Sequence, residues 1–91
     1  MKWINYDDLE FDYERYVEVY QGIPFTGIAC EYAPNGSFIS KITFRNGVRD
    51  GLARYWYPLG HLERIWTYKM GLSHGYIFEW FENGRKKLEE K

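Results

Sequence analysis

The sequence has few of the residues from which metal sites and disulfides are built. Its 91 residues include one cysteine, Cys30, and two histidines, His61 and His74. A single cysteine cannot form an internal disulfide, and a reducing compartment suits such a chain. Metal sites usually need three or four ligands at suitable spacing. We therefore expect no metal site, both histidines in turns or loops, and Cys30 as a small buried strand residue.

Features of catalytic sites are also missing. The glycines lie between apparent strands rather than before a helix, so there is no phosphate-binding loop. A thiol nucleophile needs a base beside it, and neither histidine aligns with Cys30 in the sequence. Acidic residues cluster within 7–14, where a solvated face explains them better than acid–base chemistry. We expect no catalytic residue, no cofactor and no small-molecule substrate, and therefore no enzyme.

Long apolar runs are absent as well, so we expect neither a signal peptide nor a transmembrane segment. Twelve Lys and Arg residues stand against thirteen Asp and Glu residues, which leaves a net charge of −1. Neighbouring acids offset the basic residues of 45–54 and 85–87. This balance argues against a nucleic-acid partner. The expected location is the cytoplasm.

Aromatic residues, in contrast, are abundant. Four Trp, nine Tyr and six Phe make up 21% of the chain. A chain of this length forms one small domain, 1–91, and buries only about 60–65% of the surface of its unfolded state. Large rings supply the apolar area that such a small core needs.

Eight of the nine glycines recur with a period of 24 residues, which predicts an internal repeat. Three units follow from this spacing: 27–50, 51–74 and 75–91. Aromatic and apolar positions keep the same register, as at Tyr32, Trp56 and Trp80. Residues 1–21 are less regular, and the sequence leaves open whether they form a degenerate hairpin or a cap across the sheet. The recurring glycines are Gly27, Gly51 and Gly75; Gly36, Gly60 and Gly84; Gly47 and Gly71.

Strands and turns alternate within each unit. "APNG", "YPLG" and "FENG" predict type I turns followed by a glycine bulge, and "FRNG" and "YKMG" predict the turns that join one hairpin to the next. Between turns, segments such as "SFISKITF" and "HLERIWTY" are rich in β-branched and aromatic residues. The predicted fold class is therefore all-β, built of successive hairpins.

Strict period-2 alternation divides the predicted sheet into two faces. One is nearly all apolar and is the predicted core. The other mixes rings and charges, which suits a protein interface, unless the N-terminal segment covers it and the rings belong to the core. The predicted core face holds Ile28, Tyr32, Phe38, Ile42, Phe44, Leu52, Trp56, Leu62, Trp66, Tyr68, Tyr76, Phe78 and Trp80. The mixed face holds Ala29, Glu31, Ala33, Lys41, Thr43, Ala53, Tyr55, Tyr57, Glu63, Ile65, Thr67, Ile77, Glu79 and Phe81.

The repeat resembles the MORN-repeat variant over residues 22–91. "GYIFEWFENGRKKLEE" and "GLARYWYPLGHLERIWTYKMG" are its closest copies, whereas Ala33-Pro34 and Leu59 depart from the pattern. The resemblance implies a single elongated, twisted antiparallel sheet of successive β-hairpins. It also points to the YwqK-like antitoxins, bacterial immunity proteins built from this variant, and it supplies no catalytic residues.

We therefore expect a non-catalytic antitoxin or immunity protein that binds and neutralises a cognate protein toxin. The alternative is a MORN-like structural or adaptor module that binds another protein or a membrane surface. A third expectation is self-association through the edge strand near 85–91. The predicted partner-binding residues are Tyr55, Tyr57, Phe81 and Ile65, flanked by Glu31, Glu63 and Glu79.

Overall fold

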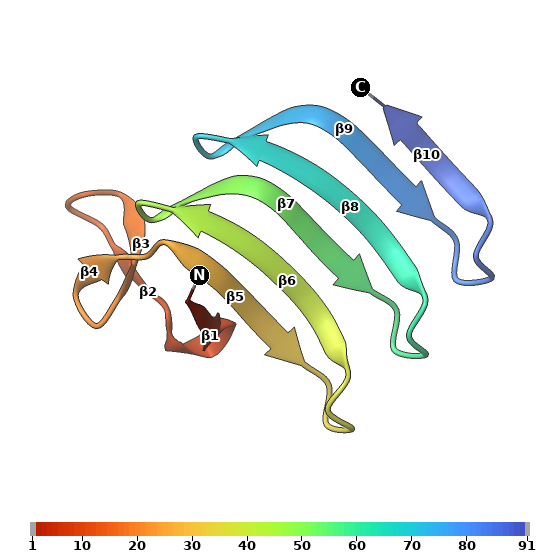
Figure 1. Ribbon diagram of the computed structural model, residues 1–91, viewed down its shortest axis with the longest axis horizontal. Coiled ribbons are helices and arrows are strands. Elements are labelled where there is room, and N and C mark those ends of the chain that lie inside the picture. The colour runs from red at the N-terminus through yellow and green to blue at the C-terminus, as the bar shows by residue number, and fades with distance from the viewer. Residues whose placement is uncertain (1, 91) are drawn as a thin grey trace.

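The computed structural model describes residues 2–90, nearly all of which lie in strands or in the tight turns between them (Figure 1). Seven strands form one sheet in the order β1-β5-β6-β7-β8-β9-β10, and β2-β3-β4 form a small second sheet. The bounds are β1 Trp3–Asn5, β2 Glu10–Asp12, β3 Val17–Tyr20, β4 Ile23–Pro24, β5 Gly27–Tyr32, β6 Phe38–Arg45, β7 Val48–Trp56, β8 Leu62–Lys69, β9 Leu72–Trp80 and β10 Lys86–Glu90, with a 3₁₀ turn η1 at Tyr6–Asp8.

The predicted all-β fold of successive hairpins is confirmed. Strands β5 to β10 follow one another across the large sheet, and each pairs antiparallel with the next. Two features were not predicted. β1 pairs parallel with β5, which covers an edge that would otherwise be open. Residues 10–24 form the small sheet instead of a further hairpin of the large one.

The two ends of the large sheet carry different turns. At one end, the N–H of Ala33 donates to the carbonyl of Ser37, and the N–H of the turn glycine Gly36 donates to the carbonyl of Ala33. The same two bonds recur at Tyr57 and Phe81. Gly36, Gly60 and Gly84 have φ of 88°, 99° and 90°. The three tips therefore share the predicted glycine-bulge geometry.

At the other end, two consecutive residues have positive φ in each turn. These pairs are Asn46-Gly47 and Met70-Gly71, with first-residue φ of 51° and 53°. Gln21-Gly22, between β3 and β4 of the small sheet, has the same form, with φ of 51° at Gln21. Two positive values at the centre define the type I′ turn, whose twist matches that of the strands. The same turn thus recurs with the repeat, and it begins already before the first 24-residue unit.

Met70 is strained in its turn, so Met70→Asn should stabilise the protein. Only glycine and, less readily, asparagine and aspartate take positive φ at low cost. Met70 is 75% exposed, so little packing is lost, and the repeat already uses Asn46 at the equivalent position. We expect a gain of about 0.5 kcal/mol, or about 2–4 °C in Tm, by thermal denaturation. Leu72→Asn, at a similarly exposed site without positive φ, should give no gain.

The core lies where the N-terminal residues cross one face of the large sheet. Phe25 packs with Phe44, their ring centroids 6.0 Å apart, and Tyr6 lies 6.3 Å from Phe44. In Figure 1 the small sheet sits at the β5 end of the large one. The buried cluster is Phe25, Ala29, Ile42, Phe44 and Ala53, with Ile4, Tyr6, Leu9, Tyr20, Tyr55 and Tyr68 packed against it.

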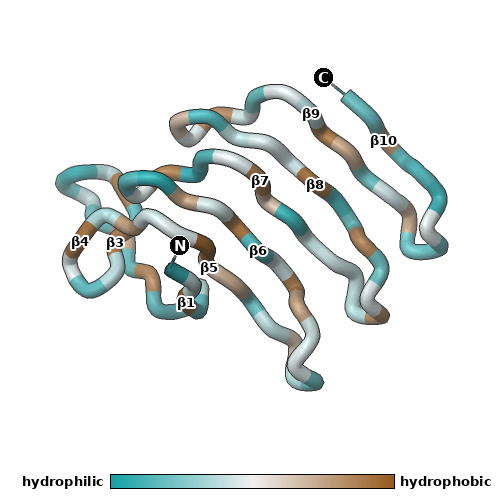
Figure 2. The backbone as a smooth tube through the Cα atoms, viewed as in Figure 1, coloured by the Kyte–Doolittle hydropathy of each residue, from teal (hydrophilic) through white to brown (hydrophobic). Residues whose placement is uncertain are grey.

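Irregular pairing near the tips changes which residues share a face. The register shifts in β6, β8 and β10 leave Ile39, Glu63 and Lys87 as extra residues, each 24 positions from the next. A bulge of this kind breaks strict alternation, since the side chains beyond it change faces. Along the strands of the large sheet, hydrophobic and hydrophilic residues follow one another in short stretches (Figure 2).

The predicted division into faces is wrong for this reason. Ile28 lies opposite Thr43, whereas Phe44 lies opposite Gly27, so Ile28 and Phe44 are on different faces. We call the face that the N-terminal residues cross the core face and the other one the aromatic face. The core face holds Ala29, Glu31, Ser40, Ile42, Phe44, Ala53, Tyr55, Arg64, Trp66, Tyr68, Ile77 and Glu79. The aromatic face holds Trp3, Ile28, Tyr32, Phe38, Lys41, Thr43, Leu52, Arg54, Trp56, Leu62, Ile65, Thr67, Phe78 and Trp80.

Cys30 is buried as predicted, with 1% of its surface exposed. Burial raises the pKa of its thiol, so less thiolate is present near pH 8 than in an unfolded chain. Because thiol reagents attack the thiolate, native Cys30 should react with Ellman's reagent on the order of 100-fold more slowly than the chain in guanidinium. Equal rates in the two states would contradict this burial.

Candidate functional site

The structure separates the seven predicted partner-binding residues. Glu31, Tyr55 and Glu79 lie on the core face, and Tyr57, Glu63 and Phe81 lie at the tip end of strands β7, β8 and β9. Ile65 lies on the aromatic face, since it pairs with Arg54 and Phe78 while its neighbour Arg64 pairs with Tyr55. The prediction that these side chains share one face is therefore wrong for Ile65, because the extra residue Glu63 shifts the register.

Tyr55 belongs to the packing of the core face. Its hydroxyl accepts a hydrogen bond from Arg49 (3.4 Å), and the guanidinium carbon of Arg64 lies 4.1 Å from its ring centroid. Arg49 also donates to the hydroxyl of Tyr68 (3.5 Å). Burial raises the pKa of Tyr55. Tyr55 therefore fits the alternative from the sequence analysis, in which the ring belongs to the core. That Tyr55 contacts a partner stays a prediction.

Tyr57, Glu63 and Glu79 meet in a polar cavity of about 120 Å³ at the tip end, lined also by Arg64, Trp80 and Lys87. The Tyr57 hydroxyl donates to the Trp80 carbonyl (2.8 Å). Burial, then the charges of Glu63, Glu82 and Glu79, raises the pKa of this phenol. The cavity places two carboxylates beside two cations, so its charges can neutralise one another without a ligand.

The aromatic face carries two runs of rings. Tyr32, Phe38 and Trp56 follow one another across three strands with centroids 5.1 and 5.8 Å apart. Along β9, Phe78 lies 5.7 Å from Tyr76 and 6.1 Å from Trp80. Pairs at these separations attract one another beyond the area they bury. The rings therefore form two ordered runs on this face, one on β5 to β7 and one on β9, with Leu62 and Ile65 of β8 between them.

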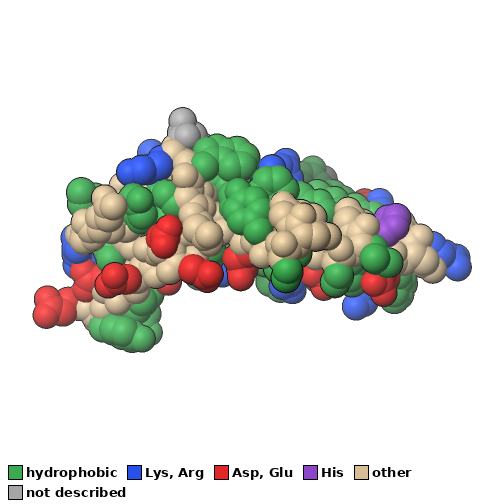
Figure 3. Space-filling view, turned by 90° about the horizontal axis from the view of Figure 1, so that it is seen from below, with side chains coloured by type: hydrophobic (Ala, Val, Ile, Leu, Met, Phe, Trp, Pro, Cys, Tyr) green, Lys and Arg blue, Asp and Glu red, His purple; other side chains and the backbone are tan. Residues whose placement is uncertain are grey.

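This surface stays open to solvent. Trp3 is 51% exposed, Tyr32 49% and Tyr76 50%, and Leu52 between them is 39% exposed. The space-filling view shows hydrophobic side chains gathered along the upper side of the molecule, with carboxylates concentrated below them (Figure 3). Large connected apolar surfaces on a small protein usually mark an interaction site. The extra residues Ile39, Glu63 and Lys87 determine this face, but they are of three unlike types, so the sequence carries no signal for them.

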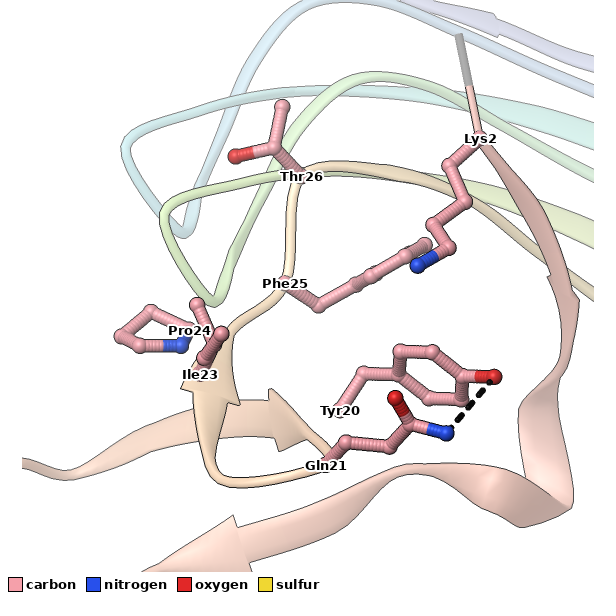
Figure 4. Close-up of a pocket in the computed structure, with 7 residues that line it drawn as sticks. All are labelled: Lys2, Tyr20, Gln21, Ile23, Pro24, Phe25 and Thr26. Carbon is pink, nitrogen blue, oxygen red and sulfur yellow. Dashed lines mark hydrogen bonds between the residues drawn. The ribbon is translucent and has the colours of Figure 1, made fainter.

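A further cavity, of about 270 Å³, lies where the N-terminal residues turn into the large sheet (Figure 4). The ammonium of Lys2 lies 4.6 Å from the ring centroid of Tyr20, and the Gln21 amide donates to the Tyr20 hydroxyl (3.5 Å). Phe25 forms its inner wall in Figure 4. Its lining includes one cation, Lys2, and no carboxylate, thiol or imidazole.

Two further observations concern the part of the chain that the structure describes. Within residues 2–90, no three His, Cys, Asp or Glu side chains gather closely enough to hold a metal ion. None of the helices found there has the length and apolar character that crossing a membrane requires.

Comparison with known proteins connects this sheet to a repeat family. No curated protein and no solved structure matched the chain. The family model of the MORN repeat variant matches residues 49–70. These residues run from β7 through the tip after Trp56 and along β8 to the type I′ turn at Met70. Repeats of this family suggest a module that mediates protein or membrane interactions. Residues 49–70, the second hairpin of the sheet, are a MORN repeat variant.

Proposed function

We propose that this protein is a non-catalytic interaction module that binds another protein through its aromatic face. The observation that carries the proposal is the open surface formed by two runs of rings, one on β5 to β7 and one on β9, while N-terminal residues pack on the opposite face. Tryptophan and tyrosine are the residues most enriched at the energetic centres of protein interfaces. A standard interface uses roughly 800 Å² per partner, and the molecule measures 41 × 33 Å along its two longer axes.

The charges on the two faces favour different partners. The predicted flanking acids Glu31 and Glu79 lie on the core face, where they would attract a basic protein. The aromatic face carries Lys41 and Arg54 among its rings, which favours an acidic protein surface.

A narrower form of the proposal concerns the kind of partner. We propose that the bound protein is a toxin which this chain neutralises, as the resemblance to the YwqK-like antitoxins implies. Such a role needs only tight binding over the toxin's active site. Its support is the resemblance together with the open binding surface, and the cytoplasm is the compartment in which neutralisation would take place.

Site-specific crosslinking tests the proposal in the host cell. The photoreactive residue p-benzoylphenylalanine is placed at Leu52, on the aromatic face, or at Tyr13, which is 81% exposed in the turn after β2. We expect irradiation to give one protein adduct from the Leu52 position and none from Tyr13. Adducts from Tyr13 alone, or lipid adducts from Leu52, would contradict protein binding through this face.

The narrower form has its own test. The crosslinked partner is expressed in a susceptible cell with and without this chain, and growth is followed. Expression of the partner alone should arrest growth, and coexpression should restore it. A partner that is harmless alone would leave an adaptor module that binds another protein as the function.

A further inference from the structure

We infer that Lys41 and Arg54 form an anion site on the aromatic face, and that a carboxylate from an acidic segment of the partner protein fills it. The inference rests on the proposed function, since it names the chemistry by which that face recognises its partner. It begins from the pairing of two adjacent strands in the middle of the sheet.

Lys41 on β6 and Arg54 on β7 are direct cross-strand partners. Residues in such positions have Cβ atoms only about 4.5–5.5 Å apart, and like charges placed there destabilise a sheet. A cation pair in the centre of a face therefore carries a cost within the protein itself. An anion from outside that contacts both side chains would remove it.

No acid of this chain occupies the neighbouring positions among the described residues. The row that crosses the face at this point continues through Cys30 on one side and Ile65 and Phe78 on the other. Glu89 follows next, at the far end of the row, where it is ion-paired with Lys86. Within residues 2–90, the ammonium of Lys41 contacts aromatic rings and forms no ion pair.

Those rings hold the lysine in place. Its ammonium lies 4.1 Å from the ring centroid of Phe38, 4.8 Å from that of Trp3 and 5.9 Å from that of Trp56. Contacts of this kind stabilise a cation without neutralising its charge. Lys41 is thus fixed in one place with its charge still available to an anion.

A cavity of about 250 Å³ lies over the pair, lined by Trp3, Ile28, Lys41, Thr43, Leu52 and Arg54. It combines two cations and a hydroxyl with apolar walls. An acidic side chain flanked by apolar residues matches this lining, because the carboxylate meets the cations while its neighbours cover the rings. A phosphate matches the cations alone, so the apolar walls favour a protein segment as its source.

Selection from a phage-displayed library of random peptides on the full chain tests the inference. We expect enriched peptides to carry Asp or Glu between aromatic or aliphatic residues. Arg54→Glu should weaken their binding at least 10-fold while leaving Tm equal or about 2–4 °C higher, since it replaces a like-charge pair with an opposite one. The matched control is Lys69→Glu, a charge reversal near the end of β8 on the same face, which should change affinity less than about twofold.

Several results would overturn the inference. Enrichment of neutral or basic peptides, no enrichment, or unchanged affinity in a folded Arg54→Glu variant would each do so. Binding of oligothymidylate or phosphatidylserine vesicles in place of acidic peptides would show that the anion is a phosphate. The crosslinking experiment tests the proposed function separately. A protein adduct at Leu52 together with selected peptides that lack Asp and Glu would contradict the anion site and leave the proposed function standing.

Discussion

Gly47→Ala is expected to cost about 3 kcal/mol or more of unfolding free energy, whereas Gly71→Ala should cost only about 1–2 kcal/mol. The two glycines hold equivalent places in successive type I′ turns, with φ of 84° and 85°. Positive φ therefore penalises alanine equally at both. The difference must come from what surrounds each turn.

The surroundings differ because the N-terminal residues pack against one turn only. A Cβ on Gly47 would lie 2.6 Å from Cβ of Val17 and 2.7 Å from the carbonyl oxygen of Glu18. At Gly71 the nearest atom would be Cβ of Val48, at an ordinary 3.6 Å. The Gly47 carbonyl also accepts a hydrogen bond from the Glu18 N–H (2.8 Å), so alanine would push β3 away from this turn.

Urea denaturation of both variants measures the difference. We expect the midpoint of Gly47→Ala to fall well below that of Gly71→Ala, with similar slopes. Equal losses would mean that β3 does not rest on this turn, and that the N-terminal residues leave the core face uncovered.

Phe44→Ala is the second substitution with a large expected effect, about 3–5 kcal/mol. Phe44 is 3% exposed and contacts the rings of Phe25 and Tyr6, so its loss would leave a cavity in the buried cluster. A domain of this size has only about 5–14 kcal/mol of stability in total. The variant should therefore be partly unfolded at 37 °C.

Phe78→Ala is the matched control for this prediction. Phe78 has two ring neighbours of its own but lies half-buried on the aromatic face. It should lose less than half as much free energy, measured by the same denaturation. A larger loss of free energy at Phe78 than at Phe44 would mean that the main core lies on the aromatic face, which would contradict the account.

The hairpins could be predicted from the sequence because their signals are local. Turn glycines such as Gly36 and Gly60 recur with the repeat, and each turn conformation depends on a few adjacent residues. The small sheet could not be predicted in the same way. Its strands β2, β3 and β4 have two to four residues each, too few for a periodic pattern to emerge.

The predicted assignment of residues to the two faces was wrong for a physical reason. Period-2 alternation holds only while each residue faces one partner, and Ile39 and Glu63 are extra residues in their strands. At one position of the repeat, the size of the residue indicates which part of the core face is covered. Ala29 and Ala53 lie in the buried cluster, whereas the equivalent residue farther along the sheet is the larger, half-buried Ile77.

The candidate site was accessible to sequence reasoning only in part. An exposed aromatic surface was predicted, but Tyr55 proved to pack against the core while Trp56, one residue later, lies on the open face. The cation pair of Lys41 and Arg54 could not be seen, because the two residues become neighbours only through the pairing of β6 with β7.

The central claim is that the aromatic face binds a partner, whereas the chain's own N-terminal residues pack on the core face over β5 to β7. The four tryptophans can report on the two faces separately. Trp3, Trp56 and Trp80 lie on the aromatic face, and Trp66 lies on the core face. Trp66 is further held by its indole N–H, which donates to Glu79 (3.2 Å).

The most direct test is ¹⁹F NMR of the 5-fluorotryptophan protein, with lines assigned by Trp→Phe variants and the strongest selected peptide as titrant. The signals of Trp3 and Trp56 should shift on binding, while that of Trp66 should stay in place. A shift confined to Trp66 would contradict the account, because it would put the partner on the core face.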